Sequence, residues 1–355
     1  INPLHYEDTL DNHLTGGYIL KVDKTTSGGI IAWTSPYPCQ TPGTGPIRFQ
    51  LHDPEIDTIH PLQKAYIQDY VTDWEVALKS NNFTDPNTGY KPYIDVGSFI
   101  DFFLINELSK NVDGYRISTF LHKQRFSEGG KLVAGPLWDF NIAWGNANYC
   151  QGGSTAGWEI NFNSVCGGGG EWQNPFWWNR MLQDPLFANE VNCRWTTWRQ
   201  STLHDDTLIH YIDSLALQLA EPASRHYQKW PILGNYVWPN NFIGQTFQAE
   251  INYLKSWIMQ RTAWMDANMF GTCNANQQEF SPNPITIHPN PTTGAFQLTG
   301  LPSEGQIYIL DLSGKIIMEQ KYSSPSILIN IEELKRGIYF ISLPNFGIYE
   351  KIIKE

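Results

Sequence analysis

Two aspartates flank a segment with the pattern of a β-hairpin, and their placement could serve chemistry on phosphates. Asp113 precedes the apolar run ISTFLHKQRF, and Asp139 directly follows the second run, KLVAGPLW. A Ser-Glu-Gly-Gly turn joins the two runs, which is a pattern typical of a hairpin. Because neighbouring strands lie about 4.8 Å apart, we expect the open ends of the hairpin to hold the two carboxylates within roughly 5–10 Å.

Two carboxylates this close repel each other unless a divalent cation or a shared proton compensates them. Mg²⁺ prefers carboxylate oxygens together with substrate phosphates. An aspartate before a short hairpin and a metal-binding aspartate after it also form the catalytic segment of protein kinases. That segment has Asn five residues after the first aspartate, where this chain has Ser118. Asp-Gly is also a common turn dipeptide, so the residues alone leave a simple turn at Asp113 open.

The surrounding sequence predicts a domain of mixed helices and strands. The stretch LTGGYILKVDK, at 14–24, predicts a strand entered through Gly-Gly. Apolar residues at helical spacing predict helices at 61–80, 95–111 and 248–269. The helix at 95–111 is apolar over most of its surface, so we expect it to be buried.

The overall composition excludes several classes of protein. Of the 355 residues, 41% are hydrophobic and 17% are charged, which indicates a globular chain. The net charge of −11 and the lack of a long Lys/Arg cluster argue against nucleic-acid binding. The sequence contains no run of 18 apolar residues, so it predicts no transmembrane helix. The chain starts without Met or a signal peptide, so we interpret residue 1 as a cut within a longer protein.

The pattern changes near residue 270, where a polar, proline-containing stretch follows the last predicted helix. Seven short alternating strands come after it, separated by turns such as NPTTG, PSEG and SG. Such regular strands predict a small all-β sandwich. We therefore expect one domain at 1–274, a linker at 275–284 and a second domain at 285–355.

The five cysteines form no Cys-x-x-Cys pair, which argues against a zinc ribbon. They are Cys39, Cys150, Cys166, Cys193 and Cys273. Cys150 and Cys166 flank a glycine-rich loop and could be bridged, and Cys193 could pair with Cys273. Buried free thiols remain an equal alternative.

Two other segments invite a functional interpretation. The glycine-rich stretch at 166–173 lacks Gly-Lys-Ser/Thr, so we expect a surface loop and no phosphate-cradling loop. The stretch EWQNPFWWNR carries three tryptophans that could stack on sugars. We favour a packed aromatic core there, because large aromatic side chains mostly serve cores.

The aspartate-flanked segment resembles the CotH kinase family of atypical kinases. That family has Asn-Glu, then Asn-x-Asp-Gly-Tyr, a hairpin, and Pro-x-Asp-x-Asp followed by a glycine. This chain has NE at 106–107, NVDGY at 111–115 and PLWDFN at 136–141, with Leu137 as one extra residue. The stretches LTGGYILKVDK, WWNRMLQDPLFANEVNCRW and AEINYLKSWIMQRTAWMD also resemble family segments, so the resemblance covers about residues 10–270.

The resemblance implies an N-terminally truncated, atypical protein-kinase-like domain that transfers phosphate from ATP to protein Ser/Thr. Asp113 would be the catalytic aspartate, and Asp139 would hold Mg²⁺ against the phosphates. Ser118 stands where the family has an Asn that is a second metal ligand, and Asn141 replaces the second Asp of the last motif. We expect both to contribute to cofactor binding. The strands that supply a phosphate-contacting Lys or Arg are expected before residue 1.

The stretch 285–355 resembles the Por-type, or type IX, secretion C-terminal sorting domain. The landmarks are PNP at 289–291, DLSGK at 311–315, Leu334 and GIY at 337–339. The resemblance implies that the type IX machinery exports the protein across a Gram-negative outer membrane, to the medium or the cell surface. The alternative function is a catalytically inactive surface adhesion or carbohydrate-binding protein of the CotH type.

Overall fold

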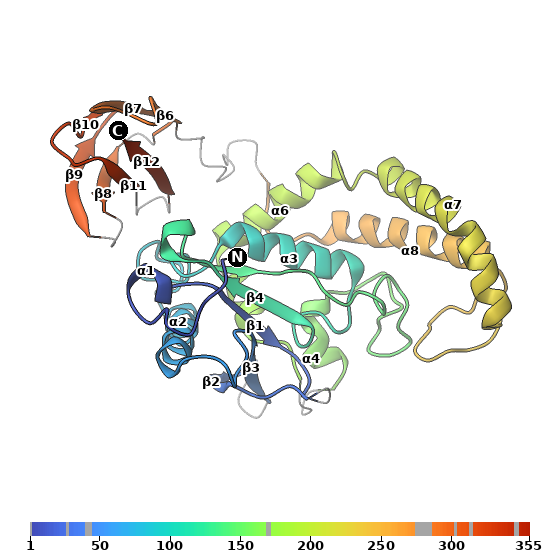
Figure 1. Cartoon of the computed structure of the whole chain (residues 1–355). Coiled ribbons are helices and arrows are strands. Elements are labelled where there is room, and N and C mark those ends of the chain that lie inside the picture. Colours follow the sequence, from blue (N-terminus) through green and yellow to red (C-terminus); the bar gives the residue numbers. More distant parts are fainter. Residues whose placement is uncertain are drawn as a thin grey trace.

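The chain divides into a part of mixed helices and strands and an all-β part, as the sequence predicts (Figure 1). The structure is a computed structural model. It describes residues 2–25, 28–39, 45–167, 172–273, 286–301, 304–311, 315–343 and 348–355, except for the side chains of 348–350. No helix among these residues is both long and apolar enough to cross a membrane.

A five-stranded antiparallel sheet carries the predicted hairpin. Its order is β2 (Trp33–Pro38), β3 (Pro46–Asp53), β1 (Tyr18–Val22), β4 (Thr119–Lys123) and β5 (Leu132–Ala134). The hairpin prediction is confirmed, because β4 pairs with β5 from Leu121↔Ala134 to Lys123↔Leu132. The predicted strand at 14–24 is confirmed as β1. A Cβ on Gly16 would lie 2.0 Å from the backbone N of Arg125, which explains the glycine at the entry to β1.

The three predicted helices are present. They are α2 (Pro61–Lys79), α3 (Val96–Ser109) and α8 (Phe247–Asn268). Most residues of α3 are buried, as expected from its apolar surface, and it packs on α8. The helix ends at Ser109 and is capped by Lys110, whose φ of 47° lies in the left-handed region and turns the chain toward Asp113.

Several further elements lie between and around these helices. They are α1 (Asp11–Leu14), α4 (Phe162–Val165), α5 (Trp177–Met181), α6 (Pro185–Arg199), α7 (Asp205–Lys229) and two 3₁₀ turns at Phe126–Glu128 and Glu159–Asn161. The helix α7 has no buried residue and packs on α8. Together α7 and α8 form an arm that projects from the sheet-containing body (Figure 1).

The tryptophan-rich segment at 172–178 contributes to the core, as we favoured. Trp177 and Trp178 are fully buried, and Trp177 lies 4.9 Å from the ring of Trp74 on α2. Trp178 stacks on Phe102 of α3 at 5.4 Å. Of the glycine-rich stretch at 166–173, the central residues lie outside the described chain.

The structure contains both of the disulfides that the sequence left open. Cys150 is bonded to Cys166, and Cys193 is bonded to Cys273. Cys39 is a buried free thiol, and its burial raises the pKa of the thiol to about 11. The second disulfide links α6 to the segment that follows α8.

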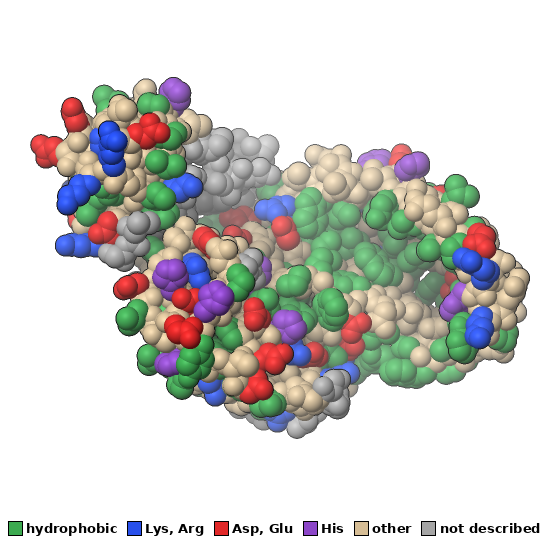
Figure 2. Space-filling model, viewed as in Figure 1, with side chains coloured by type: hydrophobic (Ala, Val, Ile, Leu, Met, Phe, Trp, Pro, Cys, Tyr) green, Lys and Arg blue, Asp and Glu red, His purple; other side chains and the backbone are tan. Residues whose placement is uncertain are grey.

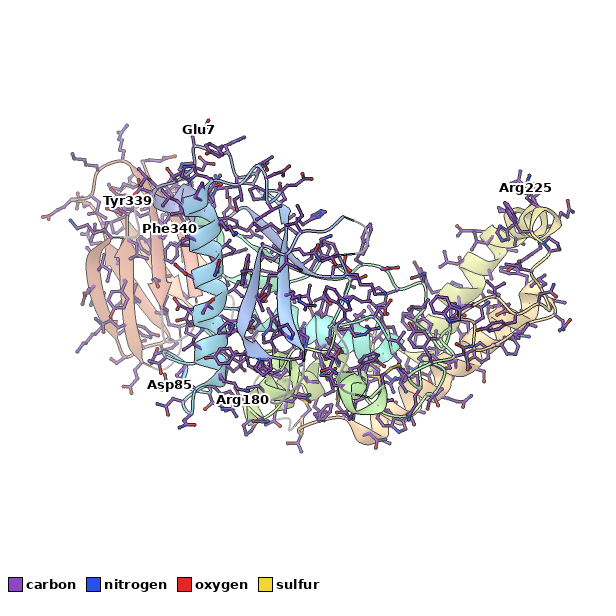
Figure 3. All side chains as sticks on the ribbon, turned by 90° about the horizontal axis from the view of Figure 1, so that it is seen from below. Glu7, Asp85, Arg180, Arg225, Tyr339 and Phe340 are labelled. Atoms are coloured by element: carbon purple, nitrogen blue, oxygen red, sulfur yellow. A yellow bond between two sulfur atoms is a disulfide. The ribbon has the colours of Figure 1, made fainter. Side chains whose placement is uncertain are left out.

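The C-terminal part consists of two antiparallel sheets around a separate core. The strands are β6 (Thr286–His288), β7 (Ala295–Thr299), β8 (Gly305–Leu310), β9 (Ile316–Tyr322), β10 (Ser326–Asn330), β11 (Gly337–Leu343) and β12 (Ile348–Lys354). One sheet has the order β10-β7-β6 and the other β12-β11-β8-β9, the latter containing the labelled Tyr339 and Phe340 (Figure 3). Buried Phe296, Leu298 and Ile341 pack between the sheets, which confirms the predicted sandwich. The expected linker at 275–284 lies outside the described residues.

Candidate active site

Asp113 lies in a tight turn that connects the end of α3 to β4. The amide of Asp113 donates to Asn111 Oδ1 (3.3 Å), and its carbonyl accepts from the amide of Ile117 (3.1 Å). A Cβ on Gly114 would lie 2.3 Å from Asn106 Oδ1, so the turn requires glycine at this position. The Asp-Gly dipeptide therefore forms a turn, and the backbone of this turn sets the position of the Asp113 side chain.

The carboxylate of Asp113 is paired with a fixed arginine. Arg116 Nη2 lies 2.5 Å from Asp113 Oδ1. The same guanidinium donates from Nε to the carbonyl of Val112 (2.8 Å) and lies 4.1 Å from the ring centre of Phe162. Asp113 keeps 14% of its side chain exposed, so the ion pair does not bury it in the core.

Burial and four nearby charged side chains determine the pKa of Asp113. Burial raises this pKa above its usual range, and the positive charges of Arg116 and Lys24 oppose the rise. The negative charges of Asp139 and Asp23 add to it. Asp113 and Asp139 are therefore close enough to influence each other's charge, and Asp23 and Lys24 lie within the same range.

Ser118 connects the carboxylates on either side of it. Its Oγ donates to Asp139 Oδ2 (3.4 Å), and its backbone amide donates to Asp23 Oδ1 (3.2 Å). Ser118 and the exposed Asp139 have φ values of 50° and 62°, in the left-handed region that non-glycine residues rarely adopt. Such conformations concentrate at functional sites, where the surrounding fold maintains them.

Asn141 lies two residues beyond Asp139 and is exposed. Its carbonyl accepts a hydrogen bond from Asn146 Nδ2 at 3.1 Å. Among the described residues, no hydrogen bond joins the Asn141 side chain to Asp113 or Asp139. Of the four predicted site residues, the structure therefore links Ser118 and Asp139 directly, brings Asp113 near them and leaves Asn141 at the edge.

Asp23 was not among the predicted site residues, and it comes from a segment far away in the chain. Asp23 follows the last residue of β1, and β1 pairs with β4 so that Val22 lies opposite Thr119. This register places Asp23 next to Ser118. Lys21 Nζ lies 3.7 Å from Asp23 Oδ2, so the same strand also delivers a cation. The charged end of the LKVDK stretch was the only signal in the sequence.

A buried ion pair supports the turn that carries Asp113. Glu107 of α3 accepts hydrogen bonds from the amides of Glu159 (2.7 Å) and Ile160 (2.9 Å) and from the Tyr115 hydroxyl (3.1 Å). Arg261 of α8 reaches Glu107 Oε2 (3.4 Å) and also donates to the Glu107 carbonyl. The Asn-Glu motif therefore has a structural role, since it joins α3, α8 and the 3₁₀ turn at Glu159.

The donors around Asp113 are suited to a hard cation. Among the described residues, no three His, Cys, Asp or Glu side chains are arranged as a complete metal site. Carboxylate and hydroxyl oxygens nevertheless fit Mg²⁺, which commonly takes one or two protein carboxylates and completes its shell with water and phosphate oxygens. A separate pocket of about 60 Å³ is lined by Lys110, Trp158 and Glu159 and contains neither Asp113 nor Asp139.

Two family models match the chain. The model of the secretion system C-terminal sorting domain matches residues 286–355, which makes the chain a secreted or cell-surface protein that uses the type IX machinery. No curated protein and no solved structure matched the chain. The model of the CotH kinase protein matches residues 5–265, well over half of the chain. The chain therefore belongs to the CotH kinase protein family.

Proposed function

We propose that this protein transfers the γ-phosphate of ATP to Ser or Thr hydroxyls of a protein acceptor, with Mg²⁺ as the metal. One observation carries the proposal: Ser118 hydrogen-bonds to both Asp139 and Asp23, beside the partly buried Asp113. Phosphoryl transfer requires little covalent chemistry from the protein. It depends on positioning and on charge neutralisation, which a cluster of fixed charged groups can provide.

We assign Asp113 to the acceptor hydroxyl. Arg116 holds Asp113 Oδ1, and we assign Oδ2 to accept the hydrogen bond from the attacking hydroxyl. Because Arg116 is itself held by the Val112 carbonyl and the Phe162 ring, the carboxylate is oriented before a substrate binds. Such pre-orientation lowers the entropic part of the barrier.

We assign Asp139 to Mg²⁺, because its carboxylate is exposed and its orientation is guided by Ser118. When bound, the cation would neutralise the charge of the phosphates. Asn141 presents an exposed amide two residues further and is the candidate for an additional nucleotide or metal contact. Lys21 of β1 and Lys24, two residues beyond the end of β1, are the candidate cations for the phosphates, so the described part of the chain itself offers positive charge near Asp113.

The acceptor protein would lie outside the cytoplasm. The sorting domain at 286–355 directs export, and we propose the surface of a Gram-negative outer membrane as the destination. Two of the three tryptophans in 172–178, Trp177 and Trp178, lie in the core, so this segment gives little support to the alternative adhesion function.

The test uses the full chain, Mg²⁺, γ-labelled ATP and a generic acceptor protein. We expect label transfer that falls at least about 100-fold in Asp113→Asn and in Asp139→Asn, since each removes a group that acts in the transition state. Asp206→Asn is the matched control, because Asp206 on α7 is 97% exposed. Equal transfer by all four proteins, or none by folded wild type that also fails to bind Mg-ATP, would contradict the proposal.

A further inference from the structure

The connection between α7 and α8 combines exposed aromatic side chains with a complete absence of charge. Residues 230–246 read WPILGNYVWPNNFIGQT, and we call this segment the aromatic loop. Trp230, Tyr236 and Trp238 expose 56%, 52% and 70% of their surfaces. Figure 2 shows hydrophobic side chains along the arm to which the loop belongs. Exposed apolar surface on this scale marks interaction sites.

The aromatic loop is held in place by several interactions. The amide of Gly234 donates to the carbonyl of Gly244 (2.9 Å), which closes the loop on itself. Asn148 donates twice, from its backbone to the Pro239 carbonyl (2.9 Å) and from Nδ2 to the Tyr236 hydroxyl (2.8 Å). These contacts fix the rings in advance, so little entropy would be lost when a ligand binds.

A parallel pair of rings adds to this rigidity. Trp238 stacks on Tyr149 with an interplanar angle of 6° and a centroid distance of 6.1 Å. Tyr149 packs against the indole of Trp238, yet Trp238 stays 70% exposed, so much of its flat ring surface remains open to a ligand. A flat ring can pack against the C–H groups of a pyranose.

The polar groups of the aromatic loop are amides and hydroxyls. Its side chains include Asn235, Asn240, Asn241 and Gln245. Asn235 Nδ2 donates to the Pro231 carbonyl and Asn241 Nδ2 to the Tyr253 hydroxyl, so these two offer mainly their amide oxygens, while Asn240 and Gln245 can donate and accept. A ligand rich in hydroxyl groups matches these partners.

The loop itself carries no charged side chain, and the two charges that contact it have opposite signs: Lys229 lies 5.8 Å from the Trp230 ring centre, and Glu250 accepts from the Gly244 amide (2.6 Å). This balance does not select an acidic or basic peptide, a nucleic acid or an anionic membrane. The combination of flat rings, amides and neutrality therefore favours a neutral sugar chain.

We propose that the aromatic loop binds a neutral polysaccharide, with Trp238 as the stacking platform and Tyr236 beside it. This site is independent of the phosphoryl transfer proposed above, because it shares no residue with it. Export to the cell surface would place the loop where polysaccharides are abundant.

The test is affinity electrophoresis of the full chain in native gels that contain hydroxyethylcellulose, xylan or galactomannan, without ATP. We expect at least one of these polymers to retard the wild type, with affinity reduced at least about 10-fold in Trp238→Ala and Tyr236→Ala. Trp238→Phe keeps a ring and should retain part of the binding. Trp138→Ala is the matched control, because Trp138 is 61% exposed in a different segment.

Three results would overturn the proposal. They are no retardation by any of the three polymers, an equal loss in Trp138→Ala and Trp238→Ala, and retardation by the anionic polymer alginate in place of the neutral ones. Thermal unfolding of each variant shows whether it is folded. If Trp238→Ala does not fold, the comparison of Tyr236→Ala and Trp238→Phe with the wild type decides in the same way.

Discussion

Substitutions of Ser118 should change how strongly the candidate site binds Mg²⁺. It has a left-handed backbone conformation and hydrogen-bonds to two carboxylates that come from separate segments. Asn tolerates this conformation better than most residues, and its carbonyl oxygen is a better ligand for a hard cation than a hydroxyl. The serine therefore tolerates replacement by the family's Asn without a change in the backbone.

We predict that Ser118→Asn lowers the Mg²⁺ concentration needed for half-maximal phosphate transfer several-fold. Ser118→Ala should raise it, because Asp139 then loses the hydrogen bond that orients it. The measurement is a Mg²⁺ titration of label transfer at constant ATP. Identical titration curves for Ser118→Asn, Ser118→Ala and wild type would show that Ser118 does not act on the metal.

Because of Glu75 on α2, the free energy of unfolding should fall as the pH rises, which is opposite to the usual effect of a carboxyl group. Burial raises the pKa of its carboxyl from 4.5 to about 7, although hydrogen bonds from Ser35 and Trp177 oppose the rise. Between these two pH values the folded protein binds more protons than the unfolded one. The contribution of Glu75 to stability is therefore fully present below about pH 4.5 and is lost as the pH rises through about 7.

We predict that Glu75→Gln removes this loss, which amounts to up to about 3 kcal/mol. The Ser35 hydroxyl can reverse its hydrogen bond, so the neutral amide can still be satisfied. The measurement is denaturant unfolding of both proteins at pH 5 and pH 8. The variant should gain stability relative to wild type as the pH rises. A constant difference between the two proteins would show that Glu75 ionises normally.

The residues of the candidate site differ in how well the sequence predicted them. Asp113 and Asp139 were found because they flank a hairpin, which is a local pattern. Asp23 depends on the pairing of β1 with β4, and these strands lie about a hundred residues apart. An alternating pattern predicts a strand but does not specify its partner or register. The contacts of Ser118 with Asp23 and Asp139 therefore became visible only in three dimensions.

At the level of elements, the junction of α3, α8 and the 3₁₀ turn at Glu159 holds the site in place. Arg261 is fully buried and donates to the carbonyls of Thr155 (3.0 Å) and Gly157 (2.7 Å) as well as to Glu107. Removing the arginine would leave Glu107 buried without a counter-charge and two carbonyls without a donor. Breaking a buried pair in this way is strongly destabilising, whereas a surface pair contributes little.

We predict that Arg261→Met lowers the free energy of unfolding by roughly 3–5 kcal/mol. The matched control is Arg225→Met at the far end of the arm, labelled in Figure 3, which should change it by at most about 1 kcal/mol. Arg225 is 70% exposed and pairs with Glu221 at 3.0 Å. Chemical denaturation of the three proteins gives the comparison. Similar losses in both variants would contradict the assigned role of Arg261.

Most elements were predictable where burial imposes a period on the sequence. The helices α2 and α3 and the seven C-terminal strands pack against cores, so their apolar residues recur at helical or alternating spacing. Helix α7 was not predicted, although Leu208, Ile209 and Ile212 recur at helical spacing; its side chains are at most half-buried against α8. Strand β2 was not predicted either, because its sequence WTSPYP contains two prolines that interrupt a strand pattern.

At the scale of the whole molecule, two parts with separate cores serve separate purposes. The first core includes α2, α3 and the five-stranded sheet, and the second lies between the two C-terminal sheets. The disulfide between Cys193 and Cys273 fixes the end of the first part to α6. Disulfides persist in oxidising compartments, which agrees with a protein that the sorting domain directs out of the cell.

We predict that deletion of residues 286–355 abolishes export and leaves the first part folded inside the cell envelope. The deleted strands β6 to β12 contain the whole second core, so no buried residue of the first core is removed. The measurement is protease accessibility on intact cells of a type IX-competent host, with the full-length protein as the positive control. A milder variant, Ile341→Asp, places an unpaired charge in the second core and should unfold the sandwich alone. Surface display that persists in both variants would show that another segment directs export.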